Sequence, residues 1–99
     1  MLFKFDLQTN CSGLTDITAE VKEAVSESGV YEGICVVFCP HTTASIMIKG
    51  DADVKANTSE TIIIAGRKLL LGRHQRIYFC ENSELENRQF FVKVMRGAL

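Results

Sequence analysis

The chain has 99 residues, which suits one domain and is too short for two. Hydrophobic residues make up 46% of it and charged residues 23%, as in a globular rather than a disordered chain. The 11 basic and 12 acidic residues give a formal net charge of −1, which provides no general attraction for nucleic acid or anionic membrane. We therefore expect neither of these as a partner.

The first residues and the cysteines indicate a cytoplasmic protein. Lys4 and Asp6 interrupt the first apolar stretch, which is unlike a signal peptide, and no apolar run reaches the roughly 20 residues that cross a bilayer. The cysteines form no CxxC pair, so a structural zinc site or a disulfide framework is not indicated. We expect reduced, buried thiols at Cys11, Cys35, Cys39 and Cys80.

One helix is predicted near the N-terminus. Thr18 is the expected N-cap, and apolar residues recur every four positions at Ile17, Val21 and Val25. Gly29 can adopt the left-handed conformation and is expected to end this helix.

The other elements read as strands separated by glycine turns and charged loops. Apolar and polar residues alternate over residues 2–8, which predicts a strand with one buried face. Residues 34–39 are all apolar, which predicts a strand buried on both faces. The expected strands are residues 2–8, 34–39, 42–49, 60–65, 69–71, 76–81 and 88–96.

About seven strands and one helix predict an α+β sandwich of mostly antiparallel strands. Segments 34–39, 62–64 and 69–71 place large apolar groups on both faces, and one helix cannot cover them all. We therefore expect a homo-oligomer that buries the second face between subunits.

The segment CPHTTA at residues 39–44 is the first candidate for chemistry. It places His41 at the start of a strand, where histidine can serve as a metal ligand, a general base or an anion-binding donor. The alternative is a histidine in a turn that bonds to the backbone. A nucleophilic pair of Cys39 with His41 is also conceivable.

Several motifs in the same order resemble the YjbQ-like family, the secondary thiamine-phosphate synthase proteins. They are GLTDIT at 13–18, the spaced valines and Ser28-Gly29, HTTASIMI at 41–48 and SETIIIAGRKLLLGRHQRIYFCE at 59–81. The resemblance spans residues 1–99 as one domain. It implies sandwich subunits that assemble as trimers, with a cleft that holds a divalent metal ion or a small phosphate-bearing ligand.

This chain departs from the family pattern in its middle. A segment with an Asn-Glu pair, a helix and a His-x-Glu-Gly-Asn loop is missing near residues 49–51, and Asp53 replaces a histidine. His74 stands where the family has tryptophan. The resemblance leaves catalytic candidates at His41, Glu81 and Arg88, ligand-binding candidates at Thr42, Thr43, Lys55 and Gln75, and metal-ligand candidates at His41, Asp53 and His74.

Plainer interpretations stay open for some of these residues. Glu81 and Arg88 could pair on the surface across the 82–87 turn, Gln75 could be an ordinary strand residue, and Lys55 could be solvated. Two functions follow. One is a weakened enzyme that joins a thiazole phosphate to a pyrimidine pyrophosphate, and the other is a catalytically inactive oligomer that binds a ligand or has a structural role.

Overall fold

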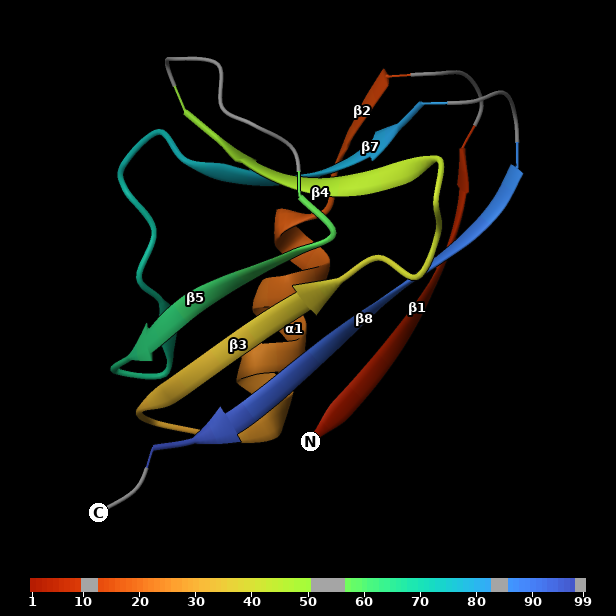
Figure 1. Cartoon of the computed structure of the whole chain (residues 1–99). Helices are drawn as coiled ribbons and strands as arrows, with labels where there is room; N and C mark the ends of the chain where they lie inside the picture. Colours follow the sequence, from red (N-terminus) through yellow and green to blue (C-terminus); the bar gives the residue numbers. More distant parts are fainter. Residues whose placement is uncertain (10–12, 51–56, 83–85, 98–99) are drawn as a thin grey trace.

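The computed structural model describes residues 1–9, 13–50, 57–82 and 86–97 (Figure 1). Within these ranges, five strands form one antiparallel sheet in the order β1-β8-β3-β5-β6, and three form another in the order β2-β7-β4. The predicted α+β sandwich is therefore confirmed. The elements are β1 (Leu2–Thr9), β2 (Gly13–Asp16), α1 (Thr18–Ser28), β3 (Gly33–Phe38), β4 (Ala44–Lys49), β5 (Ser59–Ala65), β6 (Lys68–Leu69), β7 (Arg76–Glu81) and β8 (Glu86–Arg96).

The strands differ from the sequence prediction in several bounds, since β4 begins at Ala44 rather than at residue 42 and β8 at Glu86 rather than at residue 88. The larger differences concern β2 and β6. The prediction missed β2, whose four residues include one large apolar side chain, the exposed Leu14. This strand exists because it pairs with β7, and that pairing leaves no periodic signal in the sequence. The predicted strand at 69–71 is reduced to the two residues of β6.

Helix α1 begins one residue earlier than its predicted cap implies. Thr18 is the first helical residue, so its assignment as N-cap was wrong. Its hydroxyl accepts a hydrogen bond of 2.8 Å from the backbone N–H of Ile77, while Asp16 Oδ1 accepts one of 2.9 Å from the Thr18 N–H. The rest of the prediction is confirmed, because Val21 is buried in the apolar stripe and Gly29 ends the helix with φ 71°.

The core lies between the two sheets and the helix, which covers the inner face of the five-stranded sheet (Figure 1). Phe90 of β8 stacks on Phe5 of β1 with ring centroids 5.0 Å apart. It also contacts Phe79 of β7, at 6.2 Å. These three rings come from both sheets, so the two sheets share one apolar core.

The outer face of the five-stranded sheet is apolar in its centre. Ile34 and Phe38 of β3 are 37% and 41% exposed, so the prediction that this strand is buried on both faces is wrong for the single chain. Ile63 and Met95 lie beside Ile34 on the neighbouring strands and are also exposed. We call these four residues the outer apolar face.

The cysteines that the structure describes carry free thiols. Cys35 and Cys39 are buried as predicted, Cys80 is half-buried, and Cys11 lies outside the described residues. Burial raises the pKa of the Cys35 thiol to about 12, so it stays protonated.

No helix in the described part of the chain combines the length and the apolar character needed to span a membrane.

Candidate functional site

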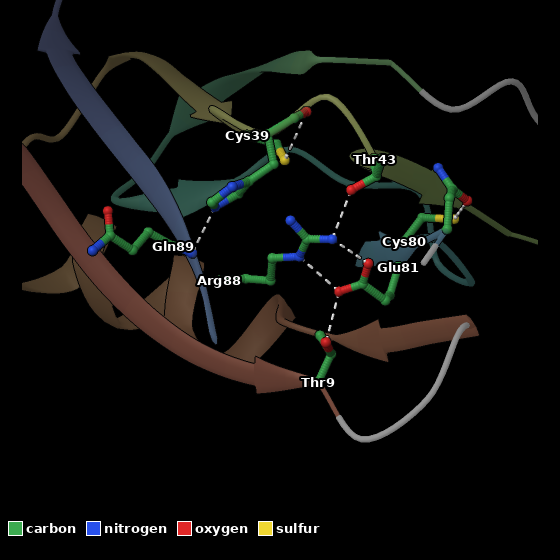
Figure 2. Close-up of polar contacts among 9 residues, drawn as sticks. Thr9, Cys39, Thr43, Cys80, Glu81, Arg88 and Gln89 are labelled. Carbon is green, nitrogen blue, oxygen red and sulfur yellow. Dashed lines mark hydrogen bonds and ion pairs between the residues drawn. The ribbon is translucent and has the colours of Figure 1, made fainter. Parts of the chain in front are cut away.

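A buried ion pair connects the two sheets at one end of the sandwich. Glu81 closes β7 in the smaller sheet, and Arg88 lies in β8 of the larger one. Arg88 Nε donates to Glu81 Oε1 at 2.8 Å, and its Nη2 donates to Oε2 at 2.5 Å (Figure 2). This two-bond geometry is the strongest that an arginine makes with a carboxylate.

The pair is buried because β7 and β8 do not form a hairpin. They belong to different sheets, so side chains seven residues apart meet in the space between the layers. The side chain of Arg88 is 4% exposed and that of Glu81 is 1% exposed. The alternative of a surface ion pair was therefore wrong.

Two threonines extend the pair into a network. Thr9, the last residue of β1, donates its hydroxyl proton to Glu81 Oε1 at 2.6 Å, and Thr43 Oγ1 accepts a bond of 2.8 Å from Arg88 Nη2 (Figure 2). Sequence reasoning missed Thr9. The signal was available, since Thr9 shares the parity of Phe5 and Leu7 on the inward face of β1.

His41 bonds to the backbone of β8. Its Nε2 accepts a hydrogen bond of 3.0 Å from the N–H of Gln89. Strand β3 ends at Phe38, which pairs with Phe91, so the imidazole takes the position where the next residues of β3 would pair with Gln89. An accepting Nε2 leaves the proton of the neutral ring on Nδ1. The interpretation of His41 as a histidine bonded to backbone is confirmed.

Hollows lie on two sides of His41. One of them, which we call the His41 hollow, has a volume of about 700 Å³. The other has about 690 Å³ and includes Thr42 in its lining. The His41 hollow is lined by Asp6, Leu7, Gln8, His41, Asn87, Arg88 and Gln89.

Cys39 does not form a nucleophilic pair with the imidazole. Its Sγ lies 4.0 Å from the backbone oxygen of His41, while the ring is directed at Gln89 (Figure 2). Burial raises the pKa of the Cys39 thiol, although a hydrogen bond with the backbone of His41 partly opposes this. The residue therefore remains a thiol packed in the core.

The structure places two of the predicted site residues, His74 and Gln75, away from His41. Ala44 pairs with Glu81 and Lys49 with Arg76, so β4 and β7 run antiparallel with the 72–75 turn at the far end. Both His74 and Gln75 lie in that turn, where Gln75 Oε1 accepts a 2.6 Å bond from the N–H of Gly72. Asp53 and Lys55 lie outside the described residues.

The described residues do not fit the metal site that the family resemblance implies. Among them, no three His, Cys, Asp or Glu side chains are grouped to hold an ion. His41 Nε2 is already bonded, and His74 lies at the other end of the three-stranded sheet. No chemical step is therefore assigned to a metal here.

Comparison with known proteins gives matches to one family in sequence and in structure. Residues 3–58 and 53–97 each match the sequence profile of the family described as UPF0047 protein YjbQ-like. The UPF0047 protein MJ1081 of Methanocaldococcus jannaschii is 35% identical over an alignment of 130 positions, which covers 96% of this chain and 94% of that protein. The UPF0047 protein YugU of Bacillus subtilis is 29% identical, over 83% of this chain and 89% of its own length.

Solved structures agree with these matches. A crystal structure from Clostridium acetobutylicum superposes with a TM-score of 0.88 at 37% identity and covers 96% of this chain and 99% of its own. The hypothetical protein APE1520 of Aeropyrum pernix superposes at 0.89 with 22% identity, a likeness of fold. Together with the profile and sequence matches, these likenesses show that this chain belongs to the UPF0047, YjbQ-like family.

Proposed function

We propose that this chain is a ligand-binding oligomer in which the transferase activity that the family resemblance implies is very low or absent. The observation that carries this proposal is the bonding of Arg88. Its guanidinium makes two bonds to the buried carboxylate of Glu81 and a third to Thr43. Its positive charge is therefore balanced within the protein.

Joining a thiazole phosphate to a pyrimidine pyrophosphate requires departure of pyrophosphate. Such a leaving group needs a cation or a metal that stabilises the charge developing on it. Arg88 is committed to Glu81, and His41 uses Nε2 to accept the N–H of Gln89. The bonds of these two residues therefore stabilise the fold, and they leave the side chains poorly suited to stabilise the leaving group.

A missing middle segment near residues 49–51 is part of the same proposal. The family profile matches this chain in two pieces, 3–58 and 53–97, as expected if residues between the two halves of the site are absent. In the resemblance, that segment supplies a glutamate and histidines to the cleft. Its loss would remove ligand groups while leaving the strands in place.

The His41 hollow is the proposed ligand site. Side chains with amide groups border it at Gln8, Asn87 and Gln89, and Asp6 adds a carboxylate. Amides both donate and accept hydrogen bonds, whereas Asp6 disfavours a second negative charge. This lining supports a small neutral ligand rich in hydroxyl or amide groups over a phosphate.

A second copy of this chain is the proposed partner for the outer apolar face. Ile34, Phe38, Ile63 and Met95 lie on three adjacent strands, and leaving such a continuous apolar patch in water is unfavourable. The family resemblance supports a trimer. Analytical ultracentrifugation should show an oligomer at micromolar concentration, and Ile63→Lys should dissociate it. Leu14→Lys, on the three-stranded sheet, is the matched control, and a monomeric wild type would refute the assembly.

The catalytic part is tested by incubating the protein with thiazole phosphate, pyrimidine pyrophosphate and Mg²⁺. We expect thiamine phosphate to form at the background rate with the wild type and with His41→Asn. Turnover that the wild type shows and His41→Asn lacks would contradict the proposal, provided that circular dichroism shows the variant folded. Gln75→Ala, at the far end of β7, is the control.

Metal content gives an independent check. Mass spectrometry of the untagged protein should show no near-stoichiometric ion that depends on His41. An ion present in the wild type and lost in His41→Asn would overturn the reading of this site as a hydrogen-bonding hollow.

A further inference from the structure

A second hollow lies away from His41, between α1 and the β5–β6 hairpin. Its volume is about 420 Å³. Three of its six lining side chains are cations, two are apolar and one is a hydroxyl. We call it the basic hollow, and its lining residues are Lys22, Val25, Ser26, Arg67, Lys68 and Leu69.

The three cations have no carboxylate partner in the described part of the chain. The ion pairs found there are Asp16 with Arg76 and Glu81 with Arg88. Three like charges around one hollow repel each other, and the formal net charge of the whole chain is only −1. The positive charge is therefore a local feature of this surface.

The sequence of α1 separates its charges by face. Lys22 and Ser26 are four residues apart and share the flank that borders the basic hollow. The helix glutamates recur at intervals of three and four residues and share a different flank, at Glu20, Glu23 and Glu27. A helix selected for ion pairs with the hairpin would instead present those glutamates to Arg67 and Lys68.

One of the three cations, Arg67, has an unfavourable backbone conformation in the turn of the β5–β6 hairpin. Gly66 and Arg67 form a two-residue turn with φ 62° and 67°, and Ala65 pairs with Lys68 on either side. Two positive φ angles in a hairpin turn favour glycine, asparagine or aspartate, and a larger residue is strained there. Arg67 is the one described residue other than glycine with positive φ. Strain at such a position is a sign of function when the side chain borders a site.

We propose that the basic hollow binds a small organic phosphate. The cations of Lys22, Arg67 and Lys68 would balance the charge of the phosphate group, and the Ser26 hydroxyl is placed to donate to it. Val25 is buried and Leu69 half-buried, so the remaining lining is apolar and suits the organic part of the ligand. This site is separate from the His41 hollow, which shares no lining residue with it.

Titration of the ¹⁵N-labelled full chain with phenyl phosphate, followed by NMR, tests the proposal. We expect saturable shifts of the Ser26, Gly66 and Arg67 amides, and weaker saturation with inorganic phosphate at the same ionic strength. Lys22→Gln and Lys68→Gln should each raise the Kd roughly threefold to tenfold. Lys4→Gln, an exposed cation on the edge strand β1, is the matched control and should leave the Kd unchanged.

Three results would overturn the inference. They are shifts that do not saturate, an equal loss of affinity in Lys4→Gln, and equal affinity for phenyl phosphate and inorganic phosphate. The His41→Asn variant separates this inference from the proposed function, because it should leave the titration of the basic hollow unchanged whether or not the His41 hollow binds a ligand.

Discussion

The ion-pair end of the sandwich and the basic hollow use cationic side chains in opposite ways. Arg88 is buried and balanced by Glu81, while Lys22, Arg67 and Lys68 are exposed and lack such a counter-charge in the described residues. A buried charge must be neutralised by the protein itself, whereas an exposed cluster can be neutralised by a ligand. A cation without a carboxylate partner is therefore a better indication of a binding site than the presence of an arginine alone.

The largest effect should come from breaking the buried pair. Arg88→Met leaves the Glu81 carboxylate buried without its cation and should lower the free energy of unfolding by roughly 3–5 kcal/mol. Urea denaturation measures this loss. In the double variant Glu81→Met/Arg88→Met no charge is left stranded, so it should be clearly more stable than Arg88→Met. A double variant as unstable as the sum of the two single changes would show that the residues act independently.

A smaller loss is expected at the edge of the same network. Thr43→Val removes the acceptor of the Arg88 Nη2 bond and should cost about 1 kcal/mol, because a hydrogen bond to a charged group is lost at a partly exposed position. The neighbouring Thr42→Val, an exposed side chain, is the control in the same denaturation experiment. Equal effects of the two changes would remove Thr43 from the network.

A substitution at the basic hollow should raise the free energy of unfolding, whereas the two changes above lower it. Arg67→Asn relieves a positive φ and removes one of three repelling cations, so it should raise the free energy of unfolding by about 1 kcal/mol. The same variant should weaken phenyl phosphate binding. Stabilisation with unchanged binding would show that Arg67 is a strained residue without a role in this site.

The smallest effect belongs to the exposed pair of Asp16 and Arg76. Partial burial would raise the pKa of Asp16, but hydrogen bonds from Arg76 and Thr18 outweigh it and hold the pKa below its usual value. Its contribution to stability is therefore present above the ordinary aspartate pKa and is lost as the pH falls through the lowered value. Asp16→Asn should slightly flatten the decline of stability with acid, measured as urea midpoints at pH 7 and pH 3. A decline as steep as that of the wild type would show that the pair contributes nothing.

Periodicity in the sequence was enough to predict most of the fold. Alternation in β1 and the stripe of α1 depend on local burial, and both are confirmed. Strand β2 depends on its partner β7, which no local pattern reveals.

The candidate site was less accessible to prediction. Motifs identified His41, Glu81 and Arg88 as residues of interest. Whether the consecutive strands β7 and β8 form a hairpin or join different sheets is decided by long-range packing. That choice buries the Glu81–Arg88 pair. The basic hollow was missed because Lys22 and Lys68 are far apart in sequence and carry no motif.

The bond from Gln89 to His41 also protects a sheet edge. Where β3 ends, the N–H of Gln89 would otherwise be an open donor at the side of β8, and such edges invite pairing with an extended strand from another chain. The imidazole closes this edge without adding a strand. Any ligand that draws the His41 ring into the neighbouring hollow would uncover it, so occupancy of that hollow and the tendency of the protein to self-associate through β8 should be linked.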